Sequence, residues 1–196
     1  MAVPLPNNSE IFTYGDYVNW PDNERWELIE GIPFDMTPAP ARIHQEILGN
    51  LFLEMNRVYA DKEGGCKIYL APFDVRFPKG KEPDAAIINV VQPDLSVICD
   101  ASKLDDKGCK GAPDVVVEII SPFTAKKDLE YKLKLYEKHR IPEYWVVHPH
   151  ERTVMVYRLN EQNKYDHAEV YGQEDVIPLS LLDNILEVNL QSVFAG

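Results

Sequence analysis

The stretch GAPDVVVEIISP, residues 111–122, decides how this chain folds. Its nearly continuous apolar run is typical of a strand that is covered on both faces in the middle of a sheet. Glu118 interrupts that run. Because a buried carboxylate is costly unless it is paired, protonated or bound to a metal, Glu118 is the most informative residue of the sequence.

Further strands are predicted on both sides of this stretch, wherever apolar and β-branched residues cluster between turn signals. These segments are KIYLAPFDVRF (67–77), AAIINVV (85–91), DLSVIC (94–99), EYWVVH (143–148), TVMVYRL (153–159) and KYDHAEVY (164–171), the last two forming a hairpin. The segment 25–36, RWELIEGIPFDM, alternates on either side of Gly31 and predicts an N-terminal hairpin.

Helices are predicted where apolar residues recur at helical spacing, over residues 42–60 and over about 124–140. Thr13 followed by Asp16 predicts a short helix ending near Trp20. This order of elements predicts an α/β (α+β) fold in which a mixed β-sheet is flanked by helices, with the N-terminal hairpin and a β-rich C-terminal segment added. A chain of 196 residues is expected to form a single domain.

Asp94 is the natural companion of Glu118, since it follows Pro93 at the start of another apolar strand. The separation of 118 − 94 = 24 positions suits two neighbouring strands joined by an excursion. Two carboxylates brought together would repel each other, and a hard divalent cation such as Mg²⁺ relieves that repulsion. The pair therefore predicts a metal site.

Lys132 is the third candidate, on the edge of the buried stripe of the second long helix. At about 100° per residue it lies about 60° from Leu129, so its ammonium can reach toward Glu118. The same count places Lys127, Lys134 and Lys138 together on the opposite, solvated face. With six Lys or Arg against three Asp or Glu in residues 126–140, this helix is a local basic surface in an acidic chain.

Four segments resemble the Uma-type family of bacterial proteins, which are assigned as endonucleases. They are VQPDLSVI (91–98), GAPDVVVEIISP (111–122), DLEYKLKLY (128–136) and IPEYWVVHP (141–149). The family in turn resembles the PD-(D/E)XK nuclease superfamily, whose restriction-endonuclease-like fold is a mixed sheet between helices. The resemblance spans roughly residues 13–157, the expected core of a single nuclease-like domain covering 1–196.

The resemblance implies which residues act. The PD motif of the superfamily matches Pro93-Asp94 and its second acidic position matches Glu118, but residue 120 is Ile where the superfamily has Lys. In Uma-type sequences the lysine lies in the following helix, where Lys132 matches. The resemblance thus implies a metal-dependent endodeoxyribonuclease with catalytic Asp94, Glu118 and Lys132, and with Mg²⁺, or Mn²⁺ as a substitute, on Asp94 and Glu118 and a backbone carbonyl near Ile119.

Other residues are weaker candidates. His44 falls inside the apolar stripe of the first long helix and is expected to face the sheet, where a lone histidine is more often structural than catalytic. Glu27 and Glu30, in the ELIEG segment that also resembles the family, are candidates to approach the same cleft.

Alternatives to the nuclease hypothesis follow from the same residues. Glu118 and Lys132 can form a buried ion pair without a metal. The Ile at position 120 and the acidic composition suit a non-catalytic interaction or DNA-binding module on a nuclease fold. Hydrolysis of a nucleotide or another small phosphate is a third possibility.

Composition sets the outer bounds. A net charge of −12, from 20 Lys and Arg against 32 Asp and Glu, excludes a protein that coats DNA through bulk charge. The absence of a signal-like start and of long apolar runs predicts a cytoplasmic protein without membrane contact.

Cys66, Cys99 and Cys109 form an odd set without a C-x-x-C pair, so we expect reduced thiols. Because members of the superfamily often dimerise, we expect a homodimer with contacts in the β-rich C-terminal half.

Overall fold

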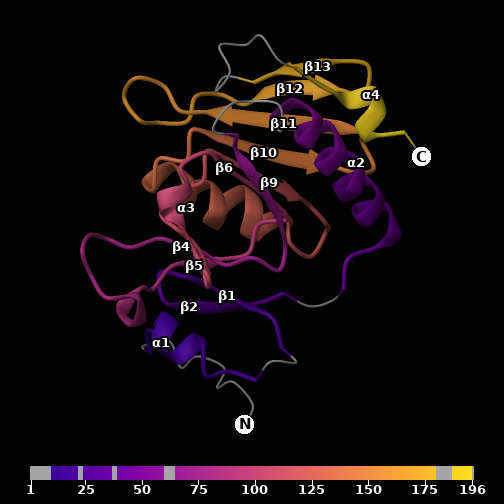
Figure 1. Ribbon diagram of the computed structural model, residues 1–196. Coiled ribbons are helices and arrows are strands. Elements are labelled where there is room, and N and C mark those ends of the chain that lie inside the picture. The colour runs from indigo at the N-terminus through magenta and orange to yellow at the C-terminus, as the bar shows by residue number, and fades with distance from the viewer. Residues whose placement is uncertain (1–9, 22–23, 37–38, 60–64, 180–186, 196) are drawn as a thin grey trace.

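Two six-stranded sheets hold most of the strands in the computed structural model, which describes residues 10–21, 24–36, 39–59, 65–179 and 187–195. Figure 1 shows one sheet above the other, with the first described residues below the lower sheet and the last described residues beside the upper one. The observed mixed architecture confirms the predicted fold class, with the strands divided between two sheets instead of gathered in one.

The upper sheet has the strand order β12-β11-β10-β9-β6-β3. Its strands are β3 (Lys67–Leu70), β6 (Leu95–Ile98), β9 (Val115–Ile119), β10 (Glu143–His148), β11 (Thr153–Arg158) and β12 (Glu169–Gly172). β9 pairs in parallel with β10 and antiparallel with β6, and all five of its residues are buried. The central strand predicted from GAPDVVVEIISP is therefore confirmed.

The lower sheet has the strand order β2-β1-β5-β4-β8-β7. Its strands are β1 (Trp26–Ile29), β2 (Ile32–Asp35), β4 (Val75–Arg76), β5 (Val90–Val91), β7 (Leu104–Asp105) and β8 (Gly108–Lys110). The predicted N-terminal hairpin is its β1–β2 edge, which turns at Glu30 and Gly31, both with positive φ. Helix α1 (Tyr14–Tyr17) contributes Tyr14 to a small cluster on the outer face of this sheet.

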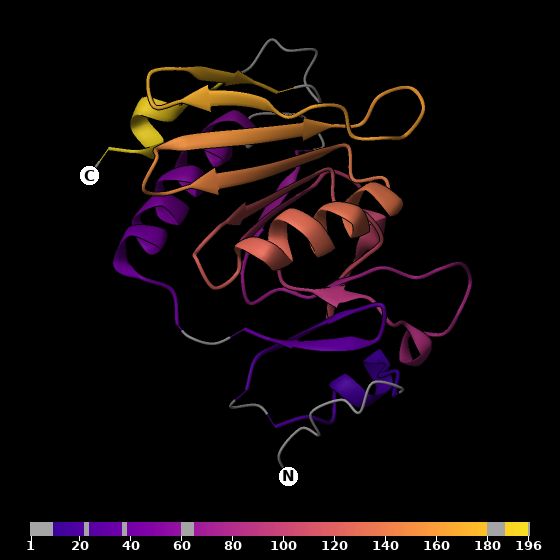
Figure 2. The same ribbon diagram turned by 180° about the vertical axis from the view of Figure 1, so that it is seen from behind.

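The two long helical segments lie on opposite faces of the upper sheet, as Figure 2 shows. Helix α2 (Arg42–Tyr59) covers one face. The other face carries a π-helix, η3 (Lys127–Lys132), which continues into α3 (Leu133–Lys138). The sheet separates the two helices, so alternate residues of β9 meet different neighbours.

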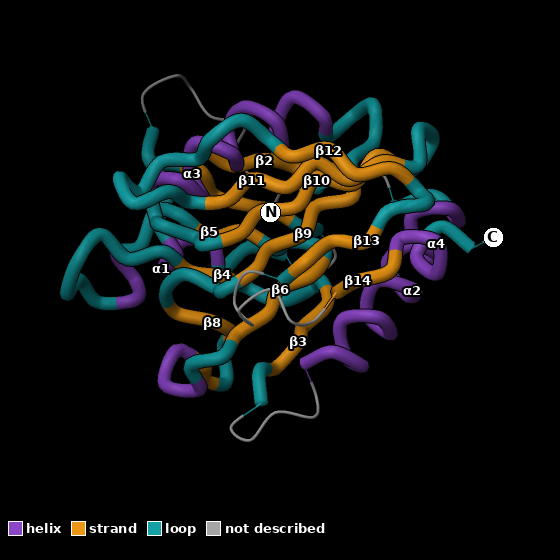
Figure 3. The backbone as a smooth tube through the Cα atoms, turned by 90° about the horizontal axis from the view of Figure 1, so that it is seen from above, coloured by secondary structure: helices purple, strands orange, loops and turns teal. Residues whose placement is uncertain are grey.

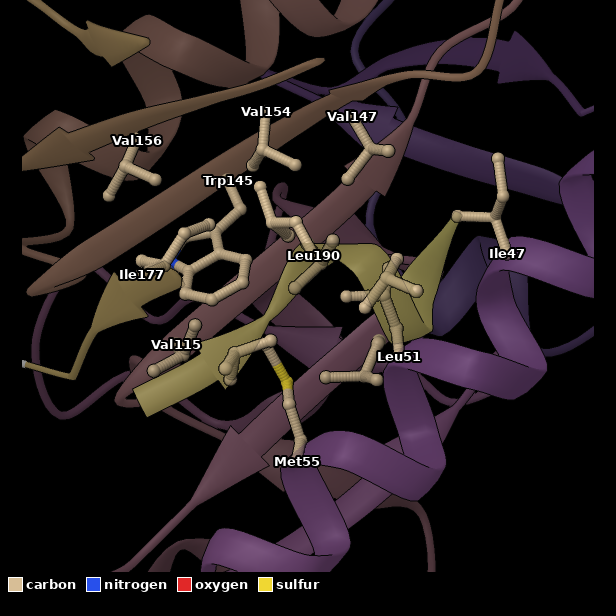
Figure 4. Close-up of a cluster of buried hydrophobic side chains, with 14 of the residues drawn as sticks. Ile47, Leu51, Met55, Val115, Trp145, Val147, Val154, Val156, Ile177 and Leu190 are labelled. Carbon is tan, nitrogen blue, oxygen red and sulfur yellow. The ribbon is translucent and has the colours of Figure 1, made fainter. Parts of the chain in front are cut away.

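The face covered by α2 is apolar throughout its centre (Figure 4). There Leu51 and Met55 of α2 pack with Val115 of β9 and Trp145 of β10, and all four side chains are fully buried. Val116, the residue after Val115 in β9, belongs to the cluster on the α3 side. Since neighbouring strand residues point to opposite faces, Glu118 lies on the same side as Val116 and faces α3.

The C-terminal part closes the α2 side. Strands β13 (Val176–Pro178) and β14 (Glu187–Asn189) form a two-stranded sheet and are followed by α4 (Leu190–Val193). Figure 3 shows α4 and β14 beside α2. Ile177, Leu179 and Leu190 enter the same apolar core as α2, so this segment extends the core beyond residue 157.

Some predicted boundaries need correction. The single strand expected over 67–77 is divided into β3 and β4, which lie in different sheets, because Pro72 between them cannot donate a ladder hydrogen bond. In the segment 85–91 only β5 is a strand. Helix α2 is confirmed up to Tyr59, and its predicted last residue, 60, lies outside the described residues.

The expectation of three reduced thiols is wrong for two of them. Cys66 and Cys99 form a disulfide, while Cys109 is free and buried. The pairing register of β3 and β6 sets Lys67 opposite Ile98, so the next pair outward is Cys66 and Cys99. A separation of 33 residues gave no local signal for this contact. In the part of the chain that the structure describes, no helix is long and apolar enough to cross a membrane.

Candidate active site

Glu118 and Lys132 form the centre of the site, as the sequence predicts. Lys132 Nζ donates to Glu118 Oε1 at 2.7 Å, and the hydroxyl of Tyr136 donates to the same oxygen at 2.7 Å. Both residues of the ion pair are almost fully buried, with 4% and 1% of their surface exposed. β9 supplies the carboxylate and the helix that follows it supplies the ammonium.

Asp94 lies beside this pair. It immediately precedes β6, and the register that pairs Leu95 with Val117 brings it level with Glu118 on the neighbouring strand. Its Oδ2 accepts a hydrogen bond from the backbone N–H of Ile119 at 2.7 Å. The predicted neighbourhood of the two carboxylates is thus present, and the backbone of β9 holds Asp94 in place.

Glu27 is a central member of the site, although the sequence indicated it only weakly. It comes from β1 of the lower sheet and is completely buried. Its Oε1 lies 2.7 Å from Lys132 Nζ and accepts from the backbone N–H of Gln92 at 2.9 Å, while Lys127 Nζ donates to Oε2 at 2.6 Å. Lys132 therefore joins a carboxylate of each sheet.

The π-helix explains why Lys127 was misplaced by the sequence analysis. In a π-helix the backbone bonds link residues five apart, so Lys127 and Lys132 come onto the same side. Both lysines bind Glu27 as a result, whereas a regular helix would have turned Lys127 to solvent. Lys134 and Lys138 do lie on the outside, but they pair with Glu130 at 3.5 Å and with Glu30 at 2.6 Å. The expected basic surface is largely neutralised by these carboxylates.

Negative charge exceeds positive charge around Lys132. Asp128 Oδ1 lies 3.7 Å from Lys132 Nζ, so three buried carboxylates surround one ammonium group, with Lys127 as the second cation. The pKa of Glu27 is lowered to about 2 because the attraction of the two lysines exceeds the effect of its burial. Burial, reinforced by the neighbouring carboxylates, raises the pKa of Glu118 well above its ordinary value.

A cavity of about 260 Å³ opens onto these groups. Asp94, Glu118 and Lys132 line it together with His44 and Arg25. Hydrogen bonds among the described residues use only Oδ2 of Asp94 and Oε1 of Glu118, which leaves the second oxygen of each carboxylate available to a ligand. The predicted catalytic residues therefore share one solvent-accessible space.

The two carboxylates fit a Mg²⁺ ion in donor chemistry. Mg²⁺ takes oxygen ligands and is usually bound by one or two carboxylates, with waters and substrate phosphates completing its shell. Among the described residues, no group of three His, Cys, Asp or Glu side chains is arranged to hold a metal. Asp94 and Glu118 would thus hold the ion with help from water or substrate, as this metal commonly requires.

His44 meets the site directly, and Glu30 does not. His44 Nε2 lies 3.2 Å from Asp94 Oδ2, while its Nδ1 is buried without a partner among the described residues. Glu30 pairs with Lys138 and Lys79 at the outer surface. Asp128 was missed because an acidic residue near the start of a helix gives no sign that it is buried.

Comparison with known proteins identifies the family of this chain. The sequence profile of the Uma2 family, described as "Putative restriction endonuclease", matches residues 14–191. The chain belongs to the Uma2 family. No curated protein sequence matches this Uma2 protein significantly.

A solved structure from Anabaena variabilis ATCC 29413, described as "a putative nuclease belonging to DUF820", is similar to this Uma2 protein. The TM-score is 0.73 and the identity 21%, over 94% of this chain and 98% of that one. At that identity the similarity establishes a shared fold. The description of the family supports nuclease function.

Proposed function

We propose that this Uma2 protein is a Mg²⁺-dependent endonuclease that hydrolyses DNA phosphodiester bonds. One observation carries the proposal. Asp94 and Glu118, on neighbouring strands, line a single cavity with one carboxylate oxygen each outside the hydrogen-bond network. A purely structural ion pair needs neither that cavity nor the second carboxylate.

Each residue then has a role at a stated atom. Asp94 Oδ1 and Glu118 Oε2 would hold the ion, and Ile119 N–H fixes Asp94 through its other oxygen. When bound, Mg²⁺ polarises the phosphate and lowers the pKa of a bound water. Lys132 Nζ, held by Glu27 and Glu118, places a positive charge at the wall of the cavity, where it would stabilise negative charge that develops on the phosphate.

The lysine position answers the main objection to catalysis. The superfamily places lysine two residues after the second acid, and this chain has Ile120 there. Lys132 nevertheless brings its ammonium to 2.7 Å from Glu118 Oε1 from the adjacent helix. A lysine therefore reaches the carboxylate from a different point of the chain, which favours the enzyme over the non-catalytic module.

The test is cleavage of supercoiled, linear duplex and single-stranded DNA with Mg²⁺ or Mn²⁺, and with EDTA. We expect cleavage only with a divalent ion and a loss of at least about a hundredfold in Asp94→Asn, together with weakened Mn²⁺ binding measured by calorimetry. Glu130→Gln is the matched control, because Glu130 is half-exposed and pairs only with Lys134 among the residues described.

Three outcomes would contradict the proposal. Failure to cut any DNA form, combined with failure to bind a divalent ion, rejects the enzyme. Unchanged biological activity in folded Asp94→Asn favours an interaction or DNA-binding module. Hydrolysis of mononucleotides without cleavage of DNA favours a small-phosphate hydrolase.

We also propose that the protein acts as a homodimer, so that two sites face two strands. The β-rich C-terminal half offers the edge strand β12, on which Val170 is 63% exposed. Light scattering at micromolar concentration should give twice the chain mass. A monomeric mass would reject the dimer without affecting the metal site.

A further inference from the structure

A second cavity, of about 360 Å³, lies next to the proposed catalytic cavity. Arg25 and Gln92 line both, so they form the wall between them. The second cavity is lined mainly by large aromatic and apolar side chains, which include Tyr17, Trp20 and Trp26. None of these aromatic residues has a role in the proposed metal chemistry.

The aromatic residues form one connected group. The rings of Tyr17 and Trp20 lie 5.6 Å apart and those of Trp20 and Trp26 lie 5.8 Å apart, in edge-to-face contact. All three are only partly buried. Glu24 fixes the indole of Trp26 by accepting from its Nε1 at 3.1 Å. Aromatic side chains presented in this way are typical of sites on which nucleic-acid bases stack.

Arg25 is held in place without a carboxylate partner among the described residues. Its Nε and Nη2 both donate to Gln92 Oε1, at 3.2 and 2.8 Å. By contrast, Arg76 and Arg158 each pair with two carboxylates. Asp74, which binds the other end of the Gln92 amide, attracts Arg25 but forms no ion pair with it. The guanidinium can therefore still bind an anion at the boundary of the two cavities, and it is well suited to a phosphate.

Gln92 makes this arrangement rigid. Only 8% of its surface is exposed, and its Nε2 donates to Tyr17 Oη and to Asp74 Oδ1, both at 2.9 Å. Its backbone N–H donates to Glu27, which in turn binds Lys132. The network thus links the aromatic cavity to the proposed catalytic centre and positions Arg25 between them.

We propose that the second cavity binds the base of an unpaired nucleotide in the DNA substrate, while Arg25 binds an adjacent phosphate. A cavity at the lower end of the ligand-site range, about 300–1,000 Å³, has room for a single base. This inference rests on the proposed function and narrows its substrate to DNA with single-stranded character, because a base in a duplex is not free to enter the cavity.

Tryptophan fluorescence tests the proposal directly. Of the three tryptophans, Trp20 and Trp26 line the cavity and Trp145 is fully buried elsewhere. The full chain carrying Glu118→Gln is titrated in EDTA with oligodeoxythymidylate, with a duplex of equal length and with an abasic oligonucleotide. We expect saturable quenching by oligodeoxythymidylate, at least about tenfold weaker binding of the duplex, and little quenching by the abasic strand.

Variants assign the effect to the cavity. Arg25→Gln should weaken binding of oligodeoxythymidylate about tenfold, and Trp20→Leu at least about fivefold. Arg57→Gln is the matched control and should bind normally, because Arg57 is 61% exposed and pairs with Glu54 on α2. Equal quenching by the abasic strand, equal affinity for the duplex, or equal affinities of the Arg25 and Arg57 variants would overturn the proposal.

The outcomes separate this inference from the proposed function. Metal-dependent cleavage without the quenching pattern rejects the aromatic cavity and leaves the endonuclease standing. The quenching pattern without cleavage or metal binding rejects the endonuclease and leaves a site for single-stranded DNA.

Discussion

The two faces of the upper sheet contrast sharply, although the same strands build both. On the α2 face, Val115 and Val117 of β9 pack with Leu51 and Trp145 in a fully buried apolar cluster. On the α3 face, Glu118 occupies the next position of the same strand and meets Lys132. The α2 face is apolar where β9 meets α2 and carries one carboxylate of β10, Glu143, which is buried and paired with Arg158. The α3 face gathers several carboxylates around Lys132.

This difference separates stability from function. The α2 face gains free energy from its buried apolar area, about 25 cal/mol per Å². The buried carboxylate of Glu143 on this face is paired with Arg158. The charged face buries Glu27, Glu118 and Asp128, whose desolvation is only partly offset by Lys132 and Lys127. Apolar side chains of similar size would stabilise the fold at least as well as these buried charges. The charged residues are therefore better explained by a role in chemistry than by a role in stability.

Replacing Lys132 should produce the largest effect. Lys132→Met leaves three buried carboxylates with one fewer cation, so we expect a loss of about 3–5 kcal/mol in the free energy of unfolding and loss of cleavage. Leu51→Ala on the opposite face should cost about 2–5 kcal/mol while the rate of the folded protein is unchanged. Urea unfolding and cleavage assays on both variants check this, and equal loss of activity in Leu51→Ala would remove the contrast.

Lowering the pH should produce the next largest effect, a loss of stability that comes from the charged face. Because the pKa of Glu27 is lowered from 4.5 to about 2, its contribution is present above pH 4.5 and is lost as the pH falls toward 2, about 3 kcal/mol in all. The raised pKa of Glu118 acts in the opposite sense and lowers stability as the pH rises above 4.5.

Urea unfolding in EDTA from about pH 2 to about pH 8 separates these two contributions. Glu118→Gln should remove the decline above pH 4.5 and keep the loss in acid. Identical pH profiles of stability for the variant and the natural chain would mean that the surroundings of Glu118 do not raise its pKa.

The disulfide should affect the apolar face alone. Cys66 and Cys99 pack against the α2 cluster, and opening their bond should cost about 2 kcal/mol. Unfolding with and without dithiothreitol measures the difference, with Cys66→Ser as the variant that should no longer respond. Titration of the denatured, unreduced chain should find only Cys109 free. Three free thiols would show that Cys66 and Cys99 are not bonded. The cytoplasmic location stays a prediction, and it would favour the reduced form of this pair.

Glu118→Gln should have the smallest effect on stability. The substitution removes one negative charge from the cluster around Lys132, where carboxylates outnumber lysines. The free energy of unfolding at pH 7 should therefore be unchanged or higher by up to about 1 kcal/mol. Cleavage should nevertheless fall at least about a hundredfold. A destabilised but active variant would show that Glu118 serves the fold and not the reaction.

The parts that the sequence predicted well share a local signal. Helix α2 is predicted by the spacing of its apolar residues, and β9 by a nearly continuous apolar run that one carboxylate interrupts. The approach of Lys132 to Glu118 followed from its place at the edge of a helix stripe. In each case the relevant periodicity lies within a few turns or one strand.

The remaining features depend on contacts between distant segments. Glu27 lies 105 positions before Lys132, 132 − 27, and its partner is set by how the lower sheet packs on the π-helix. Cys66 meets Cys99 because of the register between β3 and β6. The wall formed by Arg25 and Gln92 likewise joins residues 67 positions apart.

The sequence by itself therefore determined the class of fold, the central strand, and Glu118 and Lys132 as the buried charged residues. The reason is that burial and periodicity show in the pattern of apolar residues along a short stretch of sequence. Only the tertiary structure decided which carboxylates share Lys132, which cysteines meet and where the two cavities join. Those contacts arise from strand register and from the wider turn of the π-helix, and neither leaves a period in the sequence that local reasoning can detect.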